Sequence, residues 1–182
     1  MSFTLEQWRT LQHTVVESYP YVTITEGQTE SYPYGQFQWF IAASNTAITK
    51  WEQVLSEPNY LFGYLGYDLK NHLEDLNSAN SQLIAFPECM VFEPEFLASY
   101  QDGKVTILIG ELPSIIAAEN NLKRPTFQSP KSLTSQSEYE EKVKAIREYI
   151  RQGEVYELNY CIGFRTKAED FESPIDFWHF QS

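Results

Sequence analysis

The sequence predicts an α+β fold with largely antiparallel β-sheets and flanking helices. Two observations support this prediction: short β-branched and aromatic runs end at turn residues, and the helical patterns between them do not alternate regularly with strands, as a parallel sheet would require. A third is composition. Hydrophobic residues make up 42% of the chain and aromatic residues 15%, enough apolar side chain to build a core, so a disordered protein is excluded.

The N-terminal segment predicts a helix followed by two strands. Apolar residues recur at near-helical spacing over residues 4–17, at Leu5, Trp8, Leu11 and Val15. Thr4 can cap that helix, because its hydroxyl accepts a hydrogen bond from a free amide of the first turn. Tyr21–Thr25 is rich in β-branched residues and predicts a strand. After turn residues, Phe37–Ala43 predicts a second, largely buried strand.

The middle of the chain predicts shorter elements. A short helix is expected near residues 50–55, ending before a proline. Residues 60–67 are apolar and aromatic and predict a strand, followed by a helical turn that begins at Asp68. Gly63 and Gly66 interrupt the strand. Glycine inside a strand marks a bulge or a close approach of another backbone, and we expect one of these here.

A β-hairpin is predicted over residues 90–109. Met90–Tyr100 is strand-like, although Pro94 indicates a bulge or a sheet edge. Asp102 and Gly103 follow, a dipeptide that accepts the positive φ of a type I′ turn. Lys104–Ile109 is then the returning strand.

The C-terminal part predicts a linker, a helix and a strand. Residues 120–137 are linker-like, with prolines and hydroxyl residues. Ser137 and Glu140 predict a capping box at the start of a helix, whose apolar positions are Tyr139, Val143, Ile146 and Ile150. Gly153 predicts a left-handed helix end.

Residues 156–164 predict a strand with one apolar core face: Tyr156, Leu158, Tyr160, Ile162 and Phe164. Glu157 and Asn159 fall on the other face, which spacing alone assigns to solvent rather than to a cleft.

The net charge of the chain excludes nucleic acid and anionic membranes as partners. The chain has 25 acidic and 13 basic residues, a net charge of −12, without a basic cluster. Such a field repels nucleic acid and anionic membranes, so neither is an expected partner.

The sequence has neither a signal-peptide pattern nor a long apolar run, which predicts a cytoplasmic protein. Cys89 and Cys161 have no CxxC spacing, and we expect each to be a small buried apolar residue.

The residues alone predict no catalytic group and no metal ligand. The common phosphate-binding, hydrolase and metalloprotease motifs are absent. The three histidines are scattered, and the adjacent acidic pairs fit solvated helix faces.

Three ordered segments carry a family resemblance: Tyr19–Phe37, Gly63–Leu69, and Glu138 through Asn159. The first contains a Pro-Tyr-x-x-Phe pattern, the second reads Gly-Tyr-Leu-Gly-Tyr-Asp-Leu, and the third ends in Gly-Glu-Val-Tyr-Glu-Leu-Asn. Together they resemble the N-terminal part of the aminodeoxychorismate synthase component I family and its relative, anthranilate synthase component I. The resemblance covers essentially the whole chain.

The resemblance implies an anthranilate synthase component I-like fold, with an N-terminal domain over residues 1–125. Residues 126–182 would be a linker, helix and strand that begin a truncated chorismate-binding domain. The parent enzyme would convert chorismate and ammonia to 4-amino-4-deoxychorismate for p-aminobenzoate and folate synthesis. A glutamine amidotransferase subunit would supply the ammonia. The family's Mg²⁺ ligands and catalytic lysine would lie outside this chain, which alone would be inactive.

The same resemblance implies an amino-acid pocket that binds tryptophan in some members. The matching positions are Gly27, Tyr34, Gly35, Gln36 and Phe37. The family usually has serine where Gly27 stands, so a plain β-turn is the alternative interpretation. In the family, the polar face of this last strand faces the cleft, so the resemblance places Asn159 and Glu157 toward a cleft. Glu157 replaces the family's glutamine, an amide donor, with a group that only accepts hydrogen bonds.

Three alternatives remain. The first is anthranilate synthase component I of tryptophan synthesis; the Pro-Tyr-x-x-Phe pattern and the absence of Leu-Leu-Glu-Ser favour the aminodeoxychorismate branch. The second is a non-catalytic module that binds an amino acid or another protein. The third is a scaffold whose aromatic strands pair with another chain.

Overall fold

The computed structural model describes residues 1–27, 39–54, 60–76, 86–114, 126–169, 174–175 and 178. It divides into two compact units, Met1–Asn120 and Asn121–Ser182. All strand pairs in the described residues are antiparallel, and helices accompany them in both units. This arrangement confirms the α+β prediction.

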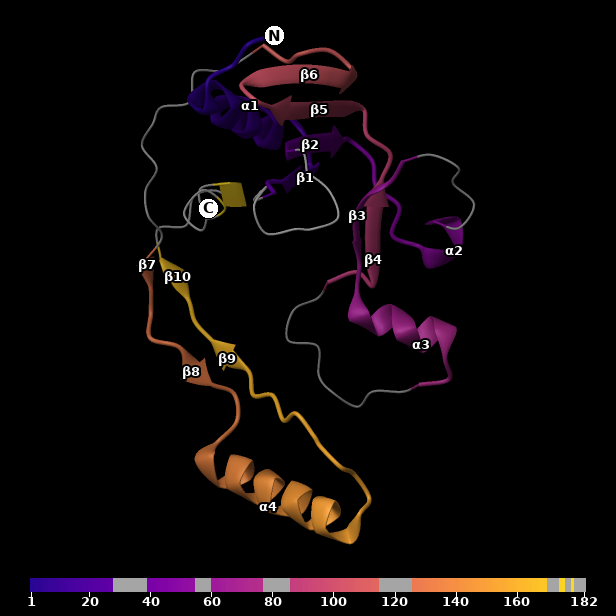
Figure 1. Ribbon diagram of the computed structural model, residues 1–182, viewed down its shortest axis with the longest axis vertical. Helices are drawn as coiled ribbons and strands as arrows, with labels where there is room; N and C mark the ends of the chain where they lie inside the picture. Colours follow the sequence, from indigo (N-terminus) through magenta and orange to yellow (C-terminus); the bar gives the residue numbers. More distant parts are fainter. Residues whose placement is uncertain are drawn as a thin grey trace. The chain divides into compact units, whose positions relative to one another are not determined.

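The first unit is built on a four-stranded antiparallel sheet in the order β1-β2-β5-β6 (Figure 1). The strands are β1 (Tyr21–Thr25), β2 (Trp39–Ser44), β5 (Phe96–Gln101) and β6 (Lys104–Ile109). Tyr21 lies opposite Ser44, and Trp39 lies opposite Tyr100. The strands predicted from Tyr21 and from Lys104 are confirmed; the strand predicted from Phe37 is described from Trp39 onward.

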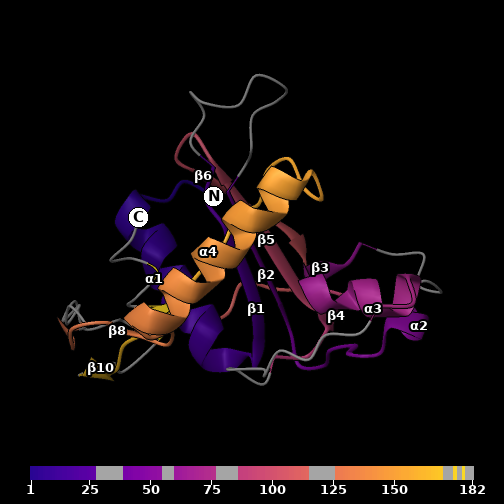
Figure 2. The ribbon, with the colours of Figure 1, turned by 90° about the horizontal axis from the view of Figure 1, so that it is seen from below.

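Helix α1 (Leu5–Ser18) accompanies this sheet (Figure 2). Its capping box joins Thr4 and Gln7: the Gln7 amide donates to Thr4 Oγ1 at 3.1 Å, and the Thr4 amide donates to Gln7 Oε1 at 2.8 Å. The predicted helix and cap are thus confirmed. The core of the unit consists of Trp8, Leu11, Val15, Ile41, Ala43, Phe96, Ala98 and Val105. Each large apolar side chain buried in such a core contributes roughly 1.5–3 kcal/mol.

The β5–β6 hairpin confirms the predicted turn, with positive φ at Asp102 (50°) and Gly103 (73°). The strand-like stretch predicted over residues 90–100 is confirmed on both sides of Pro94, but the interruption there is larger than the predicted bulge or edge. Two strands occupy this range, β4 (Cys89–Phe92) and β5, and they belong to different sheets. Pro94 lies between them, and proline has no N–H with which to continue a ladder.

The second sheet of this unit is the pair β3 (Phe62–Leu65) and β4. Ile48 bridges Val91 on β4: the Ile48 amide donates to Val91 O and the Val91 amide to Ile48 O, with nitrogen to oxygen distances of 2.7 and 3.0 Å. Short helices flank this pair: α2 (Trp51–Val54), the 3₁₀ turn η1 (Tyr67–Leu69) and α3 (Lys70–Leu73). The predicted helical turn is therefore confirmed, beginning at Tyr67 rather than at Asp68.

The described part of the second unit includes helix α4 (Gln136–Gln152) and two short antiparallel ladders (Figure 1). The ladders pair β7 (Thr126–Phe127) with β10 (Ala168–Glu169), and β8 (Lys131–Ser132) with β9 (Phe164–Arg165). The segment before the helix thus runs beside the segment after it.

The predicted C-terminal end of α4 is confirmed, and its predicted N-terminal end is wrong. The N-cap is Ser135, whose Oγ accepts the Glu138 amide at 3.2 Å. The capping box predicted at Ser137 is wrong, because Ser137 already lies inside the helix and an N-cap must have extended backbone. Gly153 ends the helix with φ 76°, as predicted. The Glu154 amide donates to Tyr149 O at 3.0 Å, so the end is a Schellman motif.

The strand predicted over residues 156–164 is largely wrong. Strand structure begins only at Phe164, and Tyr156, assigned to a core face, is 96% exposed. The alternation of apolar and polar residues suits a strand, but a strand also needs a neighbour to receive its backbone hydrogen bonds. Within residues 154–163 the structure shows one such contact to a neighbouring segment, from the Leu133 amide to Gly163 O at 2.9 Å.

Candidate functional site

The predicted amino-acid pocket is described on one side, at the end of β1. Gly27 follows this strand, and its carbonyl oxygen accepts a hydrogen bond from Trp39 Nε1 at 3.0 Å. The other predicted positions, Tyr34, Gly35, Gln36 and Phe37, lie outside the described residues. The described part of the candidate site therefore consists of the end of β1, the start of β2 and the facing part of α1.

A polar pair that the sequence interpretation missed lies beside Gly27. Gln12 on α1 is 0% exposed, and its Nε2 donates to Glu26 Oε1 at 2.8 Å. One signal in the sequence indicates this pair. Gln12 is four residues after Trp8 and next to Leu11, so the helical period places a polar amide in the buried stripe of α1.

Aromatic rings surround the same region of the core. Trp8 stacks with Tyr100 at 5.3 Å between ring centroids, and Trp39 stacks with Tyr100 at 5.5 Å. Such pairs contribute about 0.5–1.5 kcal/mol beyond the burial of their area. The Trp39 ring is also fixed by its hydrogen bond to Gly27. The end of β1 is thus held from two sides, by the indole of Trp39 and by the amide of Gln12.

The chemistry of this site suits binding rather than catalysis. Glu26 only accepts hydrogen bonds when it is ionised. Within the described ranges, no lysine, arginine or histidine forms an ion pair with it. A carboxylate of this kind can accept a hydrogen bond from a ligand that carries a donor, such as an ammonium group.

The Gly-Tyr-Leu-Gly-Tyr-Asp-Leu segment has a structural explanation for its glycines. Gly63 has φ 141°, and a Cβ there would lie 2.0 Å from Met90 O. A Cβ at Gly66 would lie 2.9 Å from Glu88 O. The close backbone approach predicted for this segment is confirmed, because β3 and β4 can pair at this distance only where β3 has no side chain.

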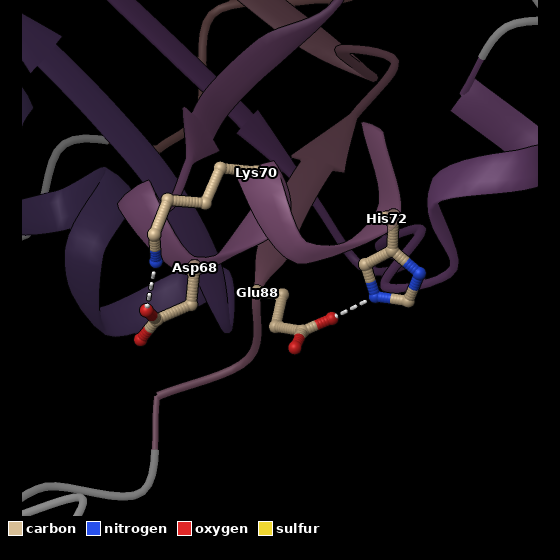
Figure 3. A network of polar contacts seen from close by, with 4 residues as sticks. All are labelled: Asp68, Lys70, His72 and Glu88. Carbon is tan, nitrogen blue, oxygen red and sulfur yellow. Dashed lines mark hydrogen bonds and ion pairs between the residues drawn. The ribbon is translucent and has the colours of Figure 1, made fainter. Parts of the chain in front are cut away.

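The polar residues of this segment pair with each other (Figure 3). Lys70 Nζ lies 3.1 Å from Asp68 Oδ1 and 4.5 Å from the centroid of the Tyr67 ring. His72 Nε2 contacts Glu88 Oε2, which joins α3 to the residue before β4. These side chains are partly exposed, and pairs of this kind contribute at most about 1 kcal/mol. Their arrangement explains the local fold and indicates no reaction.

Asn159 and Glu157 lie in the second unit, in the extended segment after α4, and both are exposed. Neither forms a hydrogen bond or an ion pair within the part of the chain that the structure describes. Their position toward a cleft stays a prediction.

The cysteines differ from each other. Cys89 is buried, as expected, and burial raises the pKa of its thiol, with the Glu52 and Glu88 carboxylates adding to the effect. The thiol therefore stays protonated and is a poor nucleophile. Cys161 is exposed, so the prediction that it is a buried apolar residue is wrong. It lies in the segment whose predicted strand face did not form.

Within the described residues, the histidine, cysteine and acidic side chains form no group of three that could hold a metal ion. The helices of this described part are too short or too polar to cross a membrane.

Comparison with known proteins connects the whole chain to one family model. The model describes a chorismate binding enzyme and matches residues 2–181. A curated relative is the "Anthranilate synthase component I-like protein" of Synechocystis sp. (strain ATCC 27184 / PCC 6803 / Kazusa), which is 25% identical over 119 residues. The match covers 59% of this chain and 24% of the relative. The chain thus spans about a quarter of the length of that relative.

Proposed function

The chain belongs to the chorismate-binding enzyme family, and on that basis we propose that it is the N-terminal part of an aminodeoxychorismate synthase component I. The observation that carries the proposal is the extent of the family match, which runs through both structural units. The Pro-Tyr-x-x-Phe pattern before β2 favours this branch of the family. The protein would act in the cytoplasm.

The proposed reaction replaces the 4-hydroxyl group of chorismate with an amino group. Chorismate and ammonia give 4-amino-4-deoxychorismate and water, and a glutamine amidotransferase subunit supplies the ammonia. The first unit would contribute an amino-acid pocket at Gly27, for tryptophan or a similar ligand. The second unit would contribute Asn159 and Glu157 to the chorismate cleft.

Mg²⁺ is part of the proposal for the whole enzyme. A bound Mg²⁺ ion would neutralise the carboxylates of chorismate, which the acidic chain would otherwise repel. The described residues do not provide a ligand set for this ion. We propose that its ligands, and the groups that act on chorismate, belong to other parts of the enzyme.

Anthranilate synthase component I is the second candidate, and the printed name of the Synechocystis relative favours it. In that reaction chorismate and ammonia give anthranilate, pyruvate and water. The two candidates share a substrate and differ in their product, so a product assay distinguishes them.

The test uses the complete gene product with chorismate, Mg²⁺ and an ammonium salt. We expect 4-amino-4-deoxychorismate, detected by chromatography and by its conversion to p-aminobenzoate with an added lyase. The fluorescence of anthranilate, together with released pyruvate, would instead establish the second candidate. No consumption of chorismate would contradict both. The 182-residue chain alone is the matched control and should show no turnover.

A further inference from the structure

We draw no further inference here: the strongest candidate, the partly exposed apolar stripe of α4 formed by Tyr139, Val143, Ile146 and Ile150, is a helix face for which nothing in the described part of the chain shows what covers it.

Discussion

The two units form helices by the same local rules but bury them very differently. Helix α1 of the first unit places Trp8, Leu11 and Val15 in a core where each is 0% exposed. Helix α4 of the second unit is longer, 17 residues against 14, and none of its side chains is buried. Both helices have hydrogen-bonded caps. Caps and helical period therefore specify a helix, while burial requires a second surface to pack against.

The stability of the two helices must then come from different sources. Most helix stability in proteins comes from packing of an apolar face, and an isolated helix of this length is marginal in water. The surface of α4 offers the side-chain pairs Gln136–Glu140 and Gln152–Glu148, each worth about 0.2–0.5 kcal/mol. Its apolar stripe is partly exposed, with Tyr139 at 43% and Ile150 at 42%. We expect α4 to be the easier helix to unfold.

The largest expected loss of stability comes from a substitution in the core of the first unit. Phe96→Ala should lower the free energy of unfolding by about 3–5 kcal/mol, because Phe96 is 1% exposed in the core of the first unit. Ile150→Ala on α4 should cost less than about 1 kcal/mol, since its side chain already contacts water. Urea unfolding followed by circular dichroism measures both. Equal losses in the two variants would show that α4 is packed as firmly as the core.

The next prediction compares two glycines with positive φ: at Gly63 a neighbouring strand leaves no room for a side chain, whereas at Gly153 only the backbone conformation requires glycine. Gly63→Ala should cost about 3 kcal/mol, because its Cβ would overlap Met90 O and force β3 away from β4. Gly153→Ala should cost only about 1–2 kcal/mol, since its surroundings are open and only the left-handed backbone is strained. Thermal unfolding of both variants measures the difference. If Gly153→Ala cost as much as Gly63→Ala, the end of α4 would have a role beyond local capping.

The smallest effect concerns pH and the loop that joins β4 to β5. The Asn45 side chain, followed by its backbone amide, donates to Glu95 and lowers the pKa of that carboxyl. A lowered pKa contributes stability above the unfolded value, near 4.5, that is lost as pH falls through the folded value. The stability difference between wild type and Glu95→Gln should therefore shrink as pH falls from 6 toward 3. Asn45→Ala should show the same trend, and a difference independent of pH would contradict this account.

Features encoded within a few residues were predictable from the sequence. The Thr4 cap, the turn at Asp102 and Gly103, and the stop at Gly153 each depend on one or two side chains and their own backbone. The glycines at 63 and 66 were recognisable for the same reason. In the candidate site, Gly27 was named by the family resemblance and not by local reasoning. The contact between Gln12 and Glu26 joins residues 14 positions apart, and it forms because packing brings α1 onto the end of β1.

Three of the predictions that failed share one physical cause, which is the lack of a partner strand or a change of sheet. The alternating pattern over residues 156–164 describes a strand with two faces, yet Tyr156 is in solvent, and no strand in the described part of the chain pairs with the residues before Phe164. At Pro94 a bulge or a sheet edge was predicted, yet the chain passes there from one sheet to the other. Cys161 was expected to be buried, and it lies in the same unpaired segment.

The sequence by itself determined the fold class, the helices, the Thr4 cap, the Gly153 stop, the hairpin turn and the family resemblance, because these depend on short-range backbone preferences and on the order of residues. Tertiary structure alone decided which faces became core, where strands found partners, and that the buried Gln12 amide donates a hydrogen bond to Glu26. These features depend on contacts between distant segments, whose free energy comes from excluding water and from satisfying buried polar groups.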